Sequence, residues 1–341
     1  MSAGQIHRRP AQAAAREGPQ GRPGYTAPLW LPGAHAQTIW PALIAPRLPV
    51  AYRRERWDTP DGDFIDVDWV DAPAPAGAPL LVLFHGLEGN SDSHYARALM
   101  AGARDRGWEA AVPHFRGCSG EPNRLARAYH SGDSDEIDWI LRRFRALRPG
   151  EAPIHAAGVS LGGNALLKWL GEREEDAGRI VRAAAAVSAP QDLAAGAQAL
   201  SRGFPLAYCT NFLKTLKVKS IEKLERFPGL YDPERVLASR TFFDFDEYVT
   251  APLHGFTGCH DYWTRSSSRR FLAGIRVPTL VLNALNDPFV PAHALAGPHE
   301  ASPAVRLDYP ADGGHVGFVG GRFPGSMRWL SDHLMHFFDH G

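Results

Sequence analysis

The sequence of 341 residues is poor in cysteine, has no long apolar run and carries no excess of either charge. Its cysteines, Cys118, Cys209 and Cys259, are too few and too scattered for a disulfide framework, and no C-x-x-C or H-E-x-x-H spacing indicates a metal site. No apolar run reaches the roughly 18 residues that a membrane-spanning helix needs. The 37 basic residues balance the 37 acidic ones, which argues against a nucleic-acid-binding surface. We therefore expect a cytoplasmic globular protein with reduced thiols, no metal, no cofactor, no nucleic-acid partner and no transmembrane segment.

The beginning of the chain lacks the periodicity of regular structure. Met1–Gly24 contains arginine, alanine and proline without the apolar stretch of a signal peptide, and we interpret it as a disordered tail. A single domain is expected over residues 25–341, and its first part, an arm over residues 25–50, is predicted to be irregular through Tyr25–Leu43. In Phe64–Val70 apolar side chains alternate with aspartates after the turn signal TPDGD, so the sequence predicts an N-terminal antiparallel hairpin.

Short continuous apolar runs recur from Pro79 onward, as in strands that are buried on both faces of a sheet. Helical stretches such as Ser93–Arg106 and Asp133–Leu147 separate them. This alternation predicts an α/β fold with a mostly parallel, doubly covered sheet. The alternation stops at about residues 191–270, which read as helical and aromatic, so we expect a helical cap insertion over one edge of the sheet. The runs are PLLVLFHG, EAAVPHFRG, IHAAGVS, RAAAAVSAP, PTLVLNALND and VRLDYP.

The stretch IHAAGVSLGGN places Ser160 in a G-x-S-x-G pattern directly after one of these runs. A helical pattern, Leu161–Leu170, follows at once, so the chain turns sharply from strand to helix at the serine. Gly158 and Gly162 lack side chains that would meet neighbouring backbone in such a turn. In a chain with 34 glycines this pattern alone does not separate a nucleophile from an ordinary turn serine. The partners of Ser160 have to come from other strand ends.

Polar residues follow other apolar runs at the carboxyl edge of the predicted sheet, where parallel sheets bind ligands. Asp287 follows PTLVLNALN, and His315 follows VRLDYPADGG. A serine hydroxyl attacks well only when an imidazole accepts its proton, and the imidazole needs a carboxylate to fix its tautomer. We therefore expect Ser160, Asp287 and His315 to act as nucleophile, acid and base.

Two alternatives to these residues are present. Asp261, in GCHDYW, is a rival acid, but it lies in the expected cap. Ser119 lies beside Cys118 in another strand-end loop, HFRGCSGEPN, but no helical pattern begins after it, so this loop is expected to form the floor of a pocket.

The backbone amides of Leu87 and Leu161 are the expected oxyanion donors, because positioned N–H groups need no reorganisation during the reaction. The helix that starts at Leu161 also directs its positive end at the developing charge. His85, Gly86 and Cys118 are the expected substrate contacts, although His85 also suits a role in bracing its own loop.

Several separated blocks resemble the YheT-like branch of the α/β-hydrolases, from about Pro28 to the C-terminus. The blocks are PGAHAQTIWPAL, FHGLEGNSDSHYARALM, HFRGCSGEPNR, YHSGDSDEIDWIL, GVSLGGNALLKWLGE and DGGHVGF. The resemblance implies the α/β-hydrolase fold and serine hydrolase activity on carboxylic esters, in a family that includes bacterial esterases, fungal acyltransferases that make ethyl esters, and membrane-anchored animal lipases and phospholipases. Carried over motif by motif, the family's triad falls on Ser160, Asp287 and His315.

We predict a carboxylic ester hydrolase that passes through an acyl-enzyme and acts on short- to medium-chain acyl esters as small-molecule substrates. Two alternatives are an alcohol O-acyltransferase that uses the same acyl-enzyme and, from a different class, a non-catalytic ligand-binding protein. The aromatic and apolar residues of the cap either line an acyl pocket or only hold the cap on the core. They are Phe204, Leu206, Tyr208, Phe212, Phe242, Phe243, Phe245 and Phe256.

Overall fold

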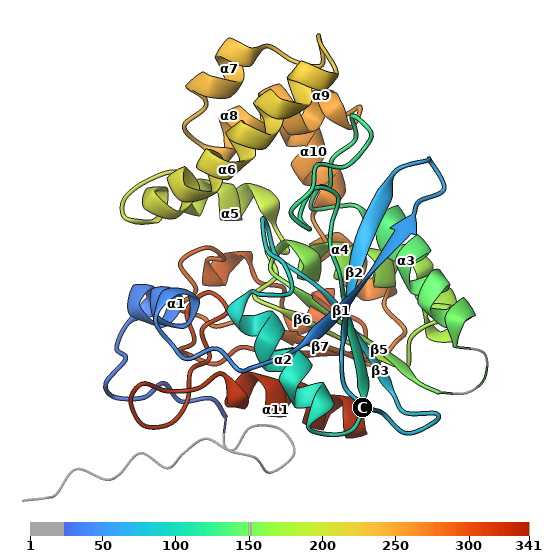
Figure 1. Ribbon diagram of the computed structural model, residues 1–341. Helices are drawn as coiled ribbons and strands as arrows, with labels where there is room; N and C mark the ends of the chain where they lie inside the picture. The colour runs from blue at the N-terminus through green and yellow to red at the C-terminus, as the bar shows by residue number, and fades with distance from the viewer. Residues whose placement is uncertain (1–23, 149, 151, 341) are drawn as a thin grey trace, which may run out of the picture.

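One mixed sheet organises the chain in the computed structural model, which describes residues 24–148, 150 and 152–340 (Figure 1). The predicted tail therefore lies outside the described residues, apart from Gly24. The strand order is β1-β2-β4-β3-β5-β6-β7-β8, and all pairs from β4 onward are parallel. The strands are β1 (Tyr52–Asp58), β2 (Phe64–Val70), β3 (Leu80–Phe84), β4 (Glu109–Pro113), β5 (Ile154–Val159), β6 (Ala183–Val187), β7 (Thr279–Leu282) and β8 (Val305–Asp308). The predicted mostly parallel sheet is confirmed.

The hairpin of β1 and β2 extends one edge of this sheet in the antiparallel sense. The aspartates of β2 alternate with its apolar residues, yet Asp66 and Asp68 are buried. Each of them accepts two hydrogen bonds from an arginine of β1, Asp66 from Arg56 and Asp68 from Arg54. Bidentate pairing of this kind satisfies a carboxylate that has been taken out of water.

Helices cover both faces of the sheet. The side chains of β3 show this, since they alternate between two separate hydrophobic cores. Leu80, Val82 and Phe84 pack in a core with residues of α3 (Ser134–Leu147) and α4 (Leu161–Arg173). Leu81 and Leu83 pack on the opposite face with residues of α2 (His94–Arg104) and α11 (Arg328–His340). The short helices η1 (Glu174–Arg179), η3 (Arg269–Gly274), η4 (Ala292–Ala294) and η5 (Pro298–Glu300) complete the connections. This is the doubly covered arrangement that the apolar runs predict.

The N-terminal arm differs from its prediction, since Ala34–Leu43 forms a helix, α1, rather than an irregular segment. Its proline, Pro41, lies inside the helix, which local preference disfavours. Long-range contacts offset this cost. Gln37 is 1% exposed, donates from Nε2 to Leu31 O and accepts at Oε1 from the side chain of Asn286 and the backbone N–H of Gly313.

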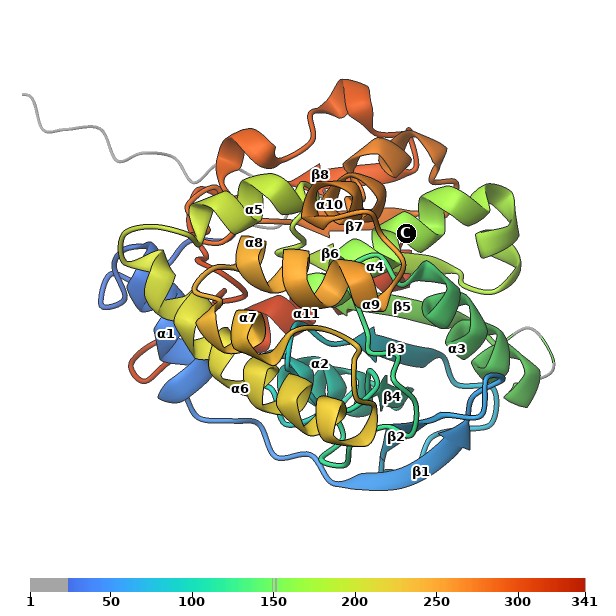
Figure 2. The same ribbon diagram turned by 90° about the horizontal axis from the view of Figure 1, so that it is seen from above.

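A helical cap stands over the carboxyl edge of the sheet, as Figure 1 shows from the side and Figure 2 from above. It consists of α5 (Leu193–Ala199), α6 (Pro205–Arg226), α7 (Pro233–Ala238), α8 (Phe242–Phe245), a π-helical turn over Asp246–Thr250, α9 (Ala251–Leu253) and α10 (Cys259–Ser266). None of the residues described between 191 and 270 lies in a strand, as predicted. Within the described part of the chain, no helix combines the length and apolarity needed to span a bilayer.

Candidate active site

Ser160 occupies a strained turn between β5 and α4. Its backbone has φ 53° and ψ −120°, and its N–H donates to Val187 O on the neighbouring strand at 2.8 Å. Glycines make the turn possible: a Cβ on Gly158 would lie 2.5 Å from Gly162 O, and one on Gly162 would lie 2.4 Å from Phe84 O. A non-glycine residue with positive φ persists only where its surroundings fix it. The turn thus presents the serine side chain at the carboxyl edge of the sheet.

His315 and Asp287 meet Ser160 at this edge. The imidazole Nδ1 lies 2.9 Å from Asp287 Oδ2, and Nε2 lies 3.0 Å from Ser160 Oγ. The other carboxylate oxygen of Asp287 accepts the backbone N–H groups of Phe289 and Val290 at 2.8 and 3.2 Å. Because a carboxylate only accepts, Nδ1 carries the proton and Nε2 is free to accept the serine proton.

The structure separates the two rival residues from this chain of hydrogen bonds. Asp261, on α10, accepts from the backbone N–H of Thr257 and from Arg265. Ser119 donates its hydroxyl to Asp66 at 2.6 Å, on the hairpin. Neither contacts His315, so the arrangement favours Asp287 and Ser160.

The amides of Leu87 and Leu161 lie beside Ser160, and we find no hydrogen-bond acceptor for either N–H among the described residues. The Leu161 N–H belongs to the first turn of α4, where intrahelical acceptors are absent. Two N–H groups without an acceptor, next to a serine, are what an oxyanion would require, and the oxyanion role stays a prediction.

Comparisons with known proteins identify the family of this chain. Residues 79–321 match the family described as alpha/beta hydrolase fold. The chain is 39% identical over 303 residues to "Putative esterase YheT" of Escherichia coli (strain K12), with 88% of both chains covered. The chain belongs to the α/β-hydrolase family. The predicted resemblance to the YheT-like branch is thereby confirmed, and so is the prediction of an esterase- or lipase-type hydrolase at this level.

More distant relatives and solved structures extend the comparison. Phospholipase ABHD3 of Mus musculus is 31% identical over 316 residues, which are 90% of this chain and 76% of that protein. The crystal structure of a Pyrococcus furiosus esterase, Pf2001, superposes with a TM-score of 0.56 at 14% sequence identity and covers 86% of this chain and 95% of that one. A likeness at such low identity concerns the fold alone.

Two of the three predicted substrate contacts of this α/β hydrolase do not line its cavity. His85 is fully buried, donates from Nδ1 to Gly86 O at 2.8 Å and accepts at Nε2 from Phe115 N–H at 3.0 Å. Burial lowers the pKa of His85 to about 3, so the ring is neutral. Gly86 donates its N–H to the hydroxyl of Tyr95. The prediction of substrate contact is therefore corrected: both residues brace the loop that carries Leu87.

Cys118, the third predicted contact, is a buried residue on the cavity wall. Burial raises the pKa of its thiol to about 12, so the sulfur stays protonated at neutral pH. Cys118 is thus placed as an apolar wall residue of the hydrolase, not as a second nucleophile.

The hydrolase encloses a cavity of about 460 Å³ between the sheet edge and the cap, with Ser160 and His315 in its wall. One part of the lining is apolar and comes mainly from the cap. Another part is polar and includes Glu88, Tyr129 and Lys219. Three of the eight predicted cap residues, Phe212, Phe242 and Phe245, line the cavity. The other five do not: Phe204, Leu206, Tyr208, Phe243 and Phe256. The apolar cap residues in the lining include Leu193, Ala197, Leu200, Phe212, Leu216, Phe242, Phe245, Val249, Leu253 and Trp263.

Proposed function

We propose that this protein hydrolyses carboxylic esters through an acyl-enzyme on Ser160. His315 Nε2 accepts the hydroxyl proton as Ser160 Oγ attacks the ester carbonyl, and Asp287 stabilises the imidazolium that forms. The amides of Leu87 and Leu161 donate to the oxygen that gains negative charge. Collapse of this intermediate breaks the bond to the alcohol, which leaves with the proton from His315. A water molecule, deprotonated by His315, then attacks the acyl carbonyl. The bond to Ser160 Oγ breaks, the carboxylic acid leaves, and His315 returns the proton to Ser160.

One observation carries this proposal. Ser160, His315 and Asp287 form a continuous hydrogen-bonded chain with separations of 3.0 and 2.9 Å, and the serine end opens into the cavity beside two unpaired amides. Nucleophile, base, orienting carboxylate and oxyanion donors are the groups that acyl transfer needs at one place. The names of the relatives, an esterase, a phospholipase and a monoacylglycerol lipase, support an ester as the substrate class.

We expect the acyl group of the substrate to be of short to medium length. Its apolar cap lining offers burial to an alkyl chain, and each buried methylene contributes about 0.8 kcal/mol, or roughly fourfold in kcat/KM. The gain stops when the space of about 460 Å³ is filled. We therefore expect kcat/KM for p-nitrophenyl esters to rise from acetyl to an intermediate length and then to fall. Acetyl as the best substrate, or palmitoyl as the best, would contradict this description of the pocket.

Replacement of the nucleophile tests the reaction itself. Ser160→Ala should abolish ester turnover and labelling by a fluorophosphonate probe, while the circular dichroism spectrum stays that of the wild type. Ser119→Ala is the matched control, because Ser119 lies outside the cavity lining and binds Asp66. Labelling that persists in Ser160→Ala and disappears in Ser119→Ala would overturn the proposal.

A further inference from the structure

Glu88, Tyr129 and Lys219 form a hydrogen-bonded cluster next to the predicted oxyanion donor Leu87. Tyr129 accepts the backbone N–H of Glu88 at 2.9 Å and donates its hydroxyl to Glu88 Oε1 at 2.8 Å. Lys219 Nζ lies 2.9 Å from Oε1 and 2.8 Å from Oε2 of the same carboxylate. All three residues line the cavity. The mechanism above assigns none of them a role.

The backbone of Glu88 explains why this position needs support. Its φ is 55°, in the left-handed region where glycine is the usual residue. The peptide that joins Leu87 to Glu88 is therefore held in a conformation that a free loop would leave. Tyr129 fixes this peptide through the Glu88 N–H, and the Glu88 carboxylate in turn fixes the Tyr129 hydroxyl. A shift of this peptide would also move Leu87.

Lys219 connects this loop to the cap, because it belongs to α6. Two further basic residues of α6, Lys223 and Arg226, follow at spacings that place them on one side of the helix. Lys223 Nζ lies 3.0, 2.9 and 3.2 Å from Asn123 Oδ1, Leu125 O and Arg127 O, and Arg226 donates to Asn123 O and Arg124 O. The helix thus contacts the loop of residues 123–127 mainly through backbone carbonyl groups.

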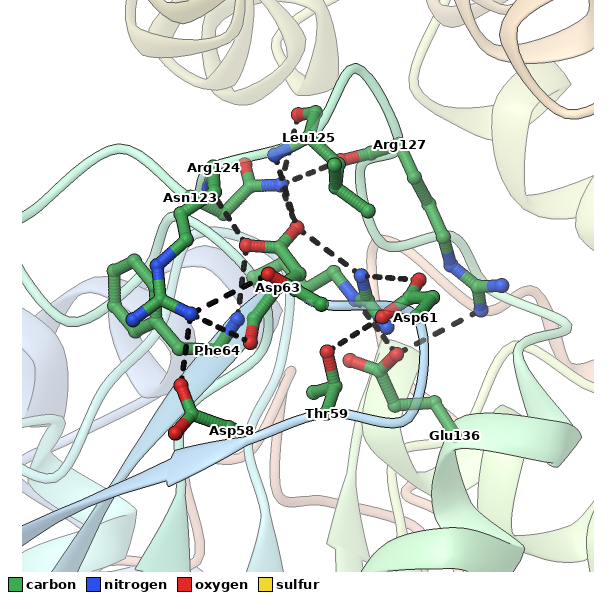
Figure 3. A network of polar contacts seen from close by, with 12 residues as sticks. Asp58, Thr59, Asp61, Asp63, Phe64, Asn123, Arg124, Leu125, Arg127 and Glu136 are labelled. Carbon is green, nitrogen blue, oxygen red and sulfur yellow. Dashed lines mark hydrogen bonds and ion pairs between the residues drawn. The ribbon is translucent and has the colours of Figure 1, made fainter.

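That loop is itself fixed from below by a buried carboxylate, as Figure 3 shows. Asp63 accepts from Asn123 Nδ2 at 2.6 Å and from the backbone N–H groups of Arg124 and Leu125 at 2.6 and 3.2 Å. Arg116 pairs with Asp63 and Glu136 at 3.1 and 2.8 Å. The loop of residues 123–127 is thus a fixed platform, and α6 docks on it so that Lys219 reaches Glu88.

We propose that Glu88, Tyr129 and Lys219 are positioning residues that hold the Leu87 amide in place for the oxyanion, so that seating of the cap through Lys219 completes the oxyanion hole. This inference rests on the proposed ester hydrolysis. Lys219 also neutralises the Glu88 carboxylate, whose charge would oppose the negative charge that develops in the same cavity. Removal of Lys219 therefore both loosens the loop and leaves that carboxylate unpaired.

Steady-state kinetics with a p-nitrophenyl ester tests the proposal. Loss of a complete oxyanion donor costs about 10²–10³ in kcat, so a misplaced donor should cost less. We expect Lys219→Met and Tyr129→Phe each to lower kcat about 10- to 100-fold while KM changes less than about threefold. Lys219→Arg should keep most of the wild-type kcat. The matched control is Lys214→Met, an exposed lysine on α6 outside the cavity, which should stay within about twofold of the wild type.

Charge compensation supplies a second test. The double variant Glu88→Gln/Lys219→Met removes both charges and keeps an oxygen that can accept the Tyr129 hydroxyl. Its kcat should exceed that of Lys219→Met alone, because the unpaired carboxylate is gone. A double variant no better than the single one would contradict the charge argument.

A third test compares the p-nitrophenyl ester with the thionoester that has the same acyl chain. The ratio of their kcat values reports on the oxyanion hole, and a residue with a merely structural role would leave this ratio unchanged. Sulfur replaces the carbonyl oxygen and fits amide donors poorly, so the preference for the oxoester over the thionoester measures the oxyanion hole. This preference should shrink at least about tenfold in Lys219→Met and Tyr129→Phe and stay unchanged in Lys214→Met. An unchanged preference in correctly folded Tyr129→Phe, with kcat near that of the wild type, would overturn the inference. Full turnover in Ser160→Ala would instead overturn the proposed function.

Discussion

Replacement of Asp287 by asparagine tests the acid of the proposed triad, the role for which the sequence also contains an alternative, Asp261. Asp287 Oδ1 accepts the backbone N–H groups of Phe289 and Val290, and Oδ2 faces His315 Nδ1 at 2.9 Å. The two N–H groups select the oxygen of the new amide, so its NH2 group points at Nδ1. Nδ1 must then accept, and the imidazole proton moves to Nε2, where it faces Ser160 Oγ. The histidine can no longer accept the serine proton.

A wrong tautomer of this kind costs on the order of 10⁴ in kcat, or about 5 kcal/mol of transition-state stabilisation. We expect this loss for Asp287→Asn in p-nitrophenyl butyrate hydrolysis, with a melting temperature close to that of the wild type because the variant is nearly isosteric. Asp261→Asn is the control, since its carboxylate contacts Thr257 and Arg265 on the cap and should matter little to kcat. A loss of less than about tenfold in Asp287→Asn, or a larger loss in Asp261→Asn, would refute this assignment of the acid.

Two further predictions concern the turn and the cap. Gly158→Ala places a Cβ 2.5 Å from Gly162 O, so we expect a loss of roughly 1–3 kcal/mol in urea-induced unfolding together with reduced turnover, whereas Gly178→Ala, whose Cβ has its nearest neighbour at 4.0 Å, should be close to neutral. Burial raises the pKa of Asp246 to about 6, with hydrogen bonds from Thr250 and Trp263 opposing the shift. Between about pH 4 and pH 6 the unfolded chain loses this proton while the folded one keeps it, so stability is lost as the pH rises. The stability of Asp246→Asn relative to the wild type should therefore be higher at about pH 7.5 than at about pH 4.5, and an equal difference at both would contradict the shift.

The strands and the candidate triad could be predicted from the sequence because their signals are local. The central strands β3, β5, β6 and β7 are short apolar runs. Ser160 directly follows β5, and Asp287 and His315 lie in the loops after β7 and β8, so all three stand at the edge where the carboxyl ends of parallel strands meet. The G-x-S-x-G pattern adds a backbone requirement that only small neighbours meet, and the contacts of Gly158 and Gly162 show its origin. Cys118 is predicted to lie at the pocket for the same reason, because its loop follows β4 at this edge, and it lines the cavity.

The hydrogen bonds that hold the loops around the triad could not be predicted, because they join residues that are far apart in the sequence. Glu88 lies in a strand-end loop, yet its partners Tyr129 and Lys219 are 41 and 131 residues away. From the sequence, a histidine after a strand can either contact substrate or hold its own loop in place. Only the hydrogen bonds of both ring nitrogens of His85 show that it holds the loop. Tertiary partners of this kind leave no periodic pattern in the sequence.

The arm helix α1 is an example of such long-range support, because it holds the loop that carries His315. Thr38 Oγ1 accepts the backbone N–H of His315 at 2.9 Å, and Gln37 Oε1 accepts that of Gly313 at the same distance. Two residues of a segment predicted to be irregular therefore fix the loop that carries the proposed base, across separations of 277 and 276 residues. Because both side chains are buried, they are satisfied only when α1 is formed against this loop. The placement of the loop that carries His315 therefore depends on α1 being packed against it, and Gln37 and Thr38 act as supporting residues of the active site.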